Sequence, residues 1–286
     1  MQRKVRWEEM FRDELEAAIA ARPVCYLAYG LAEPHGVQNA IGLDGLKAQA
    51  LVEAAARAHG GVAAPMTWWH VHETPLGLAW LAGQNAPMPR LTNVPADLFL
   101  RQLVYQLRAV EIAGFKAAIL VTGHYGGIEV DMRMAAQTYA ANRPLRATAV
   151  ADWEIMTYKD YRGDHAGVCE TSQLWALRPE LVDLSRMPAE PFEGQLFASN
   201  ESARKSSRRE GEAIVAAQVE FLKKLSDKML AEAQGETGVW FSFEEAEAIW
   251  RQVEARRPEW ISSHPVEGFG EYLQKQRAEV YPAPEV

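Results

Sequence analysis

The chain has 286 residues, 48% of them hydrophobic and 24% charged, an ordinary composition for a globular protein with a substantial core. Its formal net charge of −8 argues against a nucleic-acid partner, because a nucleic-acid interface needs a basic patch or stripe. Residues 1–16 are too charged for a signal peptide and no apolar run approaches membrane-spanning length, so we expect a cytoplasmic protein without a membrane partner.

Apolar runs alternate with segments of helical periodicity along most of the chain, which is typical of β-α units and a mostly parallel sheet. In chain order, the sequence predicts a helix over 7–21, a strand over 24–29, a helix over 44–59, a strand over 62–66, a helix over 95–113, a strand over 116–122, a helix over 128–141, a strand over 145–151, and helices over 170–177, 211–232 and 244–256. The predicted fold class is therefore α/β.

Two segments lack this alternation. Residues 67–93 contain Pro, Gly, His and Trp without periodicity, and a loop of that length in a compact domain is usually functional. Residues 236–286 are punctuated by Trp and Pro. We expect one main domain over 1–235, with 236–286 as a C-terminal appendage packed on it.

Carboxylates and a histidine follow the predicted strand 24–29. Glu33 and His35 are alternate residues of an extended segment, so their side chains can converge on one point. Asp44 opens the next predicted helix. On these three residues alone a structural interpretation is favoured: Glu33 as a surface charge, His35 as a loop histidine and Asp44 as a helix N-cap.

Two more strand ends carry the same kinds of residue. His124 lies among glycines (GHYGG) directly after the strand 116–122, and His165 precedes Glu170 in DHAGVCETS. Either histidine alone could be an ordinary turn residue, and Thr171 or Ser172 could cap a helix. Ligands in open α/β sheets bind outside the carboxyl ends of the strands, however, and the repetition at three such ends favours a functional site.

Three motifs of the chain, AYGLAEPHG…IGLDG, VTGHYGG and DHAGVCETS, resemble in order the signatures of the creatininase family. The resemblance runs from about residue 5 to about residue 230. It implies a three-layer α/β/α domain with a mostly parallel central sheet. It also implies hydrolysis of a non-peptide C–N bond in a small cyclic or linear amide, and a homo-oligomer, most commonly a hexamer.

The resemblance further implies two divalent metal ions per chain. Carried over by motif, Glu33, Asp44 and His124 correspond to ligands of one ion, Asp44 bridges to the other, and His35 is a ligand of the second. Imidazole and carboxylate ligands suit Zn²⁺ or Mn²⁺ better than Ca²⁺, with Mg²⁺ or Fe²⁺ as alternatives.

The remaining site residues are expected to act on the substrate. By resemblance, His165 is the catalytic histidine, and Tyr125 and Trp153 lie beside the substrate. His70 and His72 form a His-x-His pair on the irregular loop, where they could bind metal or contact substrate, and we expect substrate contact. The same loop could instead be a hydrophobic lid or a subunit contact.

One departure from the family bears on the metals. Creatininase has a glutamate ligand two residues after the motif histidine, where this chain has Gly126. We expect Glu170 to complete the second metal site, with Glu73 as its competitor and a helix-capping role for Glu170 as the structural alternative. Two other functions stay open, a formamide deformylase of the same family and a non-catalytic binder of a small metabolite.

Overall fold

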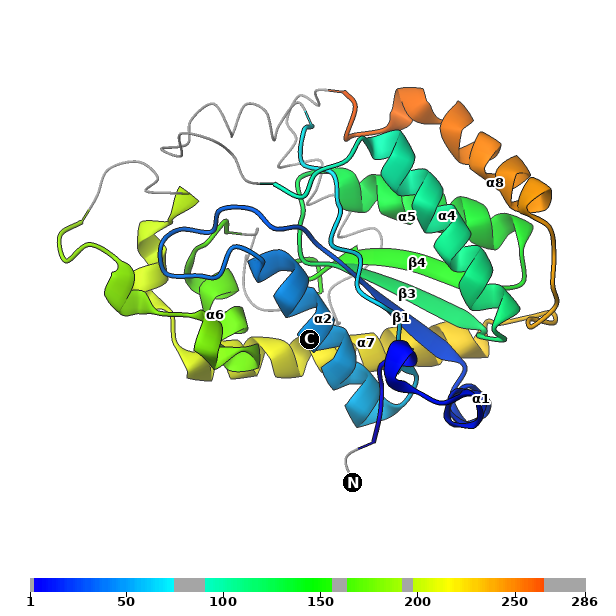
Figure 1. Ribbon diagram of the computed structural model, residues 1–286, viewed down its shortest axis with the longest axis horizontal. Coiled ribbons are helices and arrows are strands. Elements are labelled where there is room, and N and C mark those ends of the chain that lie inside the picture. The colour runs from blue at the N-terminus through cyan, green and yellow to red at the C-terminus, as the bar shows by residue number, and fades with distance from the viewer. Residues whose placement is uncertain (1–2, 75–90, 156–163, 192–197, 265–286) are drawn as a thin grey trace, which may run out of the picture.

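A parallel sheet organises the computed structural model, which describes residues 3–74, 91–155, 164–191 and 198–264. Within these residues the sheet has four strands in the order β2-β1-β3-β4 (Figure 1). They are β1 (Val24–Tyr29), β2 (Val62–Ala63), β3 (Ala117–Thr122) and β4 (Arg146–Ala151). β1 and β3 are buried along their whole length, which explains their uninterrupted apolar sequences, VCYLAY and AAILVT.

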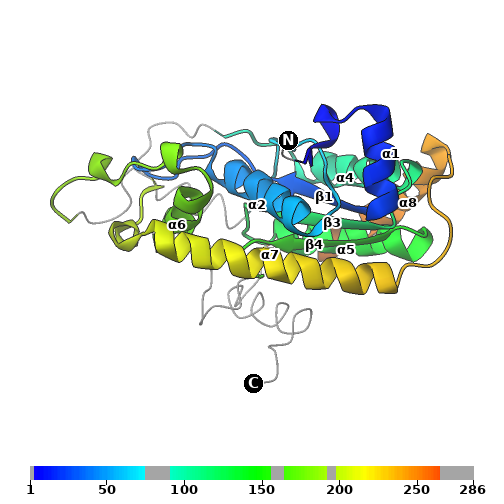
Figure 2. The ribbon, with the colours of Figure 1, turned by 90° about the horizontal axis from the view of Figure 1, so that it is seen from below.

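Helices cover both faces of this sheet. They are α1 (Arg12–Ala21), α2 (Leu43–His59), α4 (Ala96–Ile112), α5 (Ile128–Asn142), α6 (Val168–Leu177), α7 (Arg208–Ala231) and α8 (Phe243–Ala255). Alternate residues of β1 point to opposite sides. Tyr26 belongs to the apolar cluster that includes α2 and α7, and Leu27 to the one that includes α4, α5 and α8 (Figures 1 and 2). The predicted three-layer α/β/α fold is confirmed.

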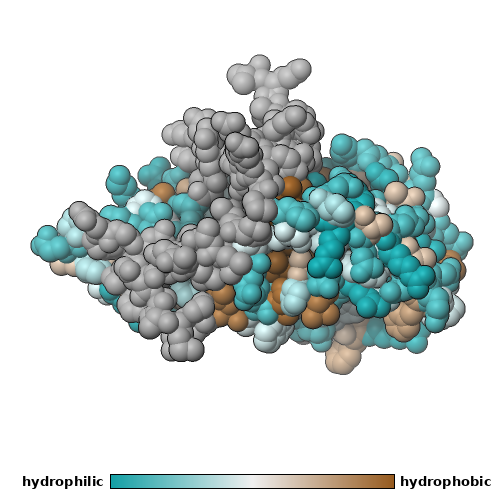
Figure 3. Space-filling view, turned by 90° about the horizontal axis from the view of Figure 1, so that it is seen from above, coloured by the Kyte–Doolittle hydropathy of each residue, from teal (hydrophilic) through white to brown (hydrophobic). Residues whose placement is uncertain are grey.

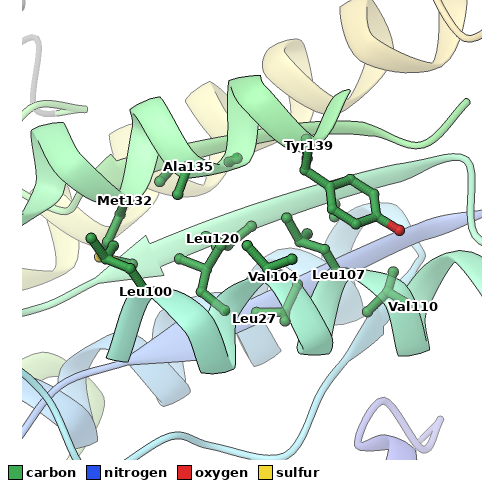
Figure 4. Close-up of a cluster of buried hydrophobic side chains, with 14 of the residues drawn as sticks. Leu27, Leu100, Val104, Leu107, Val110, Leu120, Met132, Ala135 and Tyr139 are labelled. Atoms are coloured by element: carbon green, nitrogen blue, oxygen red, sulfur yellow. The ribbon is translucent and has the colours of Figure 1, made fainter. Parts of the chain in front are cut away.

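The larger core lies between the sheet and the α4–α5 pair. Leu100, Val104 and Leu107 of α4 pack against Leu120 of β3 and Met132 of α5 (Figure 4). These side chains are fully buried, so truncating one leucine to alanine is expected to cost about 2–5 kcal/mol. This rigid core fixes the strand ends that carry the site.

The observed elements follow the predicted ones, with local differences. Pro65 lacks the N–H that a ladder requires, and the strand predicted over 62–66 is only Val62–Ala63. The helix predicted over 7–21 is divided into a 3₁₀ turn, Trp7–Glu9, and α1. The last long helix begins earlier than predicted because the Ser207 hydroxyl accepts the N–H of Glu210. Other 3₁₀ turns lie at Pro179–Leu181, Leu184–Arg186, Glu201–Lys205 and Arg257–Glu259.

The C-terminal segment packs on the main domain through α8. A capping box between Ser242 and Glu245 starts this helix, and its buried residues Ile249 and Trp250 join the α4–α5 core. The surface over α4 and α8 is mostly hydrophilic (Figure 3). Residues 75–90 of the irregular loop and 265–286 of the appendage lie outside the described residues, and the domain boundary stays a prediction.

The two cysteines, Cys25 and Cys169, are free thiols. No helix in this part of the chain combines the length and the hydropathy needed to cross a membrane.

Candidate metal centre

The site forms where the carboxyl ends of β1 and β3 meet the first turn of α2. A Cβ atom on Gly30 would lie 2.4 Å from the backbone nitrogen of Gly45, and one on Gly123 would lie 2.2 Å from the Asp44 carbonyl oxygen. Only glycine at both strand ends lets the helix start come this close. The result is that Asp44 is inserted between the segments that carry His35 and His124.

Asp44 is the shared member of two groups of side chains. Its Oδ1 lies 3.2 Å from Nε2 of His35, and its Oδ2 lies 3.1 Å from Nδ1 of His124. The carboxylate is 1% exposed. Each oxygen thus serves a different imidazole, which is the arrangement of a bridging carboxylate.

The first group contains Glu33, Asp44 and His124, whose ligand atoms all lie within 4.8 Å of one another. Glu33 Oε1 is 3.0 Å from Nδ1 of His124. An ion bound at about 2.0–2.1 Å by nitrogen and oxygen holds neighbouring ligand atoms roughly 3 Å apart. These distances therefore fit a metal shell.

The second group contains His35, Asp44 and Glu170, within the same 4.8 Å limit. His35 Nδ1 lies 3.0 Å from the carbonyl oxygen of Glu33 and donates to it, so Nε2 keeps its lone pair in the neutral ring. That Nε2 is buried without a hydrogen-bond partner, and it faces Asp44 Oδ1 and Glu170 Oε2, the latter at 3.7 Å. A buried lone pair facing carboxylate oxygens requires a proton or a cation between them.

Electrostatics leads to the same requirement. Burial opposes the charged form of His35 and His124, but the facing carboxylates raise their pKa values to about 9 and about 10. Burial also opposes ionisation of Glu33 and Asp44, yet the neighbouring imidazoles hold both pKa values below the usual range. The carboxylates are thus ionised and require nearby positive charge, which either protons or divalent cations can supply.

Glu170 is placed by contacts with both of its oxygens. Oε1 accepts from Lys47 Nζ at 2.5 Å and from the Tyr125 hydroxyl at 2.8 Å, and Oε2 accepts the Ala166 N–H at 2.9 Å. The start of α6 is capped instead by Asp164, which accepts the N–H groups of Cys169 and Glu170. Asp164 thus satisfies these first-turn N–H groups, and Glu170 adds one contact to the helix start, through Ala166. The competitor Glu73 is exposed and belongs to none of the ligand groups found among the described residues.

His165 lies against the second group. Its ring stacks on that of His35 with 4.2 Å between centroids, and its Nε2 is 2.9 Å from the Pro34 carbonyl oxygen. Because Nε2 donates there, Nδ1 carries the lone pair, and it lies 4.0 Å from Glu33 Oε1. The side chain is 25% exposed, so it can meet a ligand entering from solvent. Burial and the neighbouring His35 lower the pKa of His165.

The two histidines of the irregular loop face protein groups. His70 Nδ1 accepts the Val71 N–H, and Nε2 donates to the Thr122 hydroxyl at 3.1 Å. Burial lowers the pKa of His70 to about 3, so this ring is neutral. His72 Nε2 lies 2.8 Å from Glu33 Oε2. The expectation that these two histidines contact substrate receives no support from this geometry.

Tyr125 lies beside Glu170, and Trp153 lies beside Tyr125. Their rings lie edge to face with 6.1 Å between centroids. Trp153 is only 2% exposed, whereas Tyr125 is half-buried. Tyr125 therefore presents more surface to a ligand than Trp153 does.

Sequence reasoning missed Lys47 and Asp152. Both are buried, and Lys47 Nζ lies 3.2 Å from Asp152 Oδ2. Burial raises the pKa of Asp152 to about 7, although Lys47 opposes the shift. Two signals were available: Lys47 is three residues after Asp44, on the same helix face, and Asp152 directly follows a strand, as the other site residues do.

Comparisons with known proteins agree with this fold. A family model described as creatininase, creatinine amidohydrolase, matches residues 8–233. A creatinine amidohydrolase from Pseudomonas putida is 25% identical over 242 residues, covering 72% of this chain and 90% of that protein.

Solved creatininase structures are similar in fold. A crystal structure of creatinine amidohydrolase aligns with a TM-score of 0.61 and 23% identity, covering 81% of this chain and 99% of the other. A structure described as creatininase with Mn gives 0.60 and 23%, over 81% and 100% of the two chains. A mutant creatininase of Zn-Zn type gives 0.61 and 22%, over 81% and 99%. These likenesses show a shared fold, and the two ligand groups of this chain have the composition of a divalent-metal site.

Proposed function

This chain belongs to the creatininase family, and from that premise we propose that it hydrolyses a non-peptide C–N bond in a small cyclic or linear amide at a binuclear metal centre. The observation that carries the proposal is the position of Asp44 between two imidazoles, with one carboxylate oxygen facing each. A carboxylate shared in this way is what a pair of closely spaced cations requires.

The residues fit two divalent cations, Zn²⁺ or Mn²⁺, in composition and charge. Glu33, Asp44 and His124 would hold the first ion, and His35, Asp44 and Glu170 the second. The three carboxylates supply three of the four negative charges needed to neutralise two dications. The remaining positive charge favours an anionic nucleophile and an anionic transition state.

When bound, such ions polarise an amide carbonyl and lower the pKa of a water molecule that they hold. His165 moves the proton. Its Nδ1 lone pair faces the ligand groups while Nε2 is held by the Pro34 carbonyl, so Nδ1 can accept a proton and deliver it to the departing nitrogen. The half-buried Tyr125 ring, whose hydroxyl donates to Glu170, would orient a small planar substrate.

A metal and activity assay tests the proposal. Protein produced with added Mn²⁺ or Zn²⁺ should hold about two ions per chain and hydrolyse at least one compound in a panel of creatinine, lactams, linear amides and formamides. Turnover confined to formamides would identify a deformylase. Protein that holds no metal and turns over nothing would be a binder, and the proposal would be wrong.

Glu170→Gln and Glu73→Gln form a matched pair for the second site. Glu170→Gln should reduce the metal content from about two to about one and abolish turnover, because a two-metal reaction fails with one ion. Glu73→Gln changes an exposed side chain and should alter neither quantity. The reverse result would identify Glu73 as the ligand.

A further inference from the structure

A lysine is buried beside the second group of ligands. Lys47 belongs to α2, is 0% exposed, and directs its ammonium group at three carboxylates. Nζ lies 2.5 Å from Glu170 Oε1, 3.2 Å from Asp152 Oδ2 and 3.9 Å from Asp44 Oδ1. Lysine is almost never fully buried unless it is paired, because removing an ammonium group from water is costly.

The contacts of Lys47 determine which oxygen of Glu170 is available. Oε1 accepts from both Lys47 and the Tyr125 hydroxyl, whereas Oε2 accepts only the Ala166 N–H among the described residues and faces His35. A carboxylate whose first oxygen is filled by two donors can offer only the second oxygen, through its remaining lone pair, to an ion. From this we infer that Lys47 is a positioning residue for the second metal site, where it fixes Glu170 as a single-oxygen ligand through Oε2.

This inference rests on the proposed function, since it takes Glu170 as a ligand of the second ion. It also explains why a charged residue, and not an apolar one, occupies this buried position of α2. Glu170 lies on a segment 123 positions away in the chain, and Lys47 links that segment to the helix that carries Asp44. One ammonium group thereby couples the bridging carboxylate to the second-site carboxylate.

A test must distinguish two effects of Lys47 on metal binding: its positive charge, and its contact that orients Glu170. A positive charge close to a metal site repels the ion, but Asp152 next to Lys47 offsets that repulsion. Replacing Lys47 alone would leave Asp152 uncompensated and change the local charge. The double variant Lys47→Met/Asp152→Asn removes both partners, so a change in metal binding reports mainly on the orientation of Glu170.

We would measure stepwise Mn²⁺ binding by calorimetry and by electron paramagnetic resonance on the metal-depleted full chain. The wild type should bind two ions and show the exchange-coupled spectrum of a Mn²⁺ pair. Lys47→Met/Asp152→Asn should bind the first ion as the wild type does and the second about 10–100-fold more weakly, the usual loss when a partner of a metal ligand is removed. Its spectrum at two equivalents should be that of isolated Mn²⁺.

Two controls accompany the double variant. Asp152→Asn keeps Lys47 but removes the charge that offsets it, so the second ion should bind more weakly while the spectrum at saturating Mn²⁺ remains that of an exchange-coupled pair. Arg143→Met/Glu111→Gln removes another largely buried ion pair, between α5 and α4, and should lower thermal stability without changing either binding step. Circular dichroism verifies that every variant is folded.

The outcomes separate the two proposals. A wild type that never binds a second ion would overturn the binuclear centre and the inference together. A wild type that binds two ions, with an unchanged second step in a folded double variant, would overturn the role of Lys47 alone. If the double variant does not fold, Tyr125→Phe decides, because it removes the other donor to Oε1. A weakened second binding step in Tyr125→Phe would support positioning of Glu170 through Oε1. An unchanged second step with an unchanged spectrum would count against it.

Discussion

Replacing His165 by alanine separates proton transfer from metal binding. General acid–base catalysis contributes about 10²–10⁴-fold, so kcat/KM for the best substrate of the panel should fall by that factor, or about 2.7–5.4 kcal/mol in transition-state stabilisation. The structural loss is expected to be small, because the side chain is 25% exposed and its hydrogen bond to Pro34 is worth about 1 kcal/mol.

The assay for this variant combines steady-state kinetics with metal analysis. His165→Ala should retain about two ions per chain, and added imidazole should restore part of the rate, because the vacated space opens to solvent. His59→Ala, at the far end of α2, is the control and should behave as the wild type. His165 also lies within ligand distance of Glu33 and His35. If His165→Ala lost an ion, His165 would be a ligand and its role as proton carrier would be refuted.

Three other predictions concern metal affinity, stability and assembly. The carboxylates that raise the pKa of His35 to about 9 and of His124 to about 10 keep both rings protonated in the metal-free protein at neutral pH, so a metal must displace those protons. Apparent affinity should therefore rise about tenfold per pH unit for each proton displaced, with proton release measurable by calorimetry, and a pH-independent affinity would contradict the pKa shifts. Thr122→Val removes the hydroxyl that accepts from His70 and donates to the His124 carbonyl. It should lower the free energy of unfolding, measured with urea, by about 1–3 kcal/mol. An unchanged free energy of unfolding would mean that these two hydrogen bonds are not formed. The family resemblance predicts a homo-oligomer, most commonly a hexamer, which fits the 71% exposed Trp240, and light scattering that finds only monomer at micromolar concentration would refute it.

Most of the fold could be predicted because its strong signals are local. The apolar runs VCYLAY and AAILVT are long enough, and free enough of Gly and Pro, to be central strands. Glu33, His35 and His124 could be grouped because each follows such a strand, and carboxyl ends of parallel strands share one edge. The end of β2 depends on one residue, Pro65, and the start of α7 on another, Ser207. Sequence patterns predict the ends of elements less well than the elements themselves.

The sequence could not reveal which polar residues support others. Lys47 resembles any exposed helical lysine until α6 is packed against α2, because its place three residues after Asp44 does not identify Glu170 as its partner. His70 and His72 lie on an extended segment, and their sequence does not show whether the rings face protein or ligand. The position of Thr122 shows that His70 contacts protein. Such roles depend on tertiary packing between distant segments, which local patterns do not encode.

The separation of the ligands along the chain has a consequence for the lifetime of the protein. Glu33, His124 and Glu170 follow different strands, so an unfolded chain offers no preformed site and cations bind only the assembled sheet. By mass action, an ion at a hundred times its Kd adds about 2.7 kcal/mol to the free energy of unfolding. Proteases act on the opened chain, whose population falls as that free energy grows. Metal supply in the cell should therefore set how long each molecule survives as well as whether it can react.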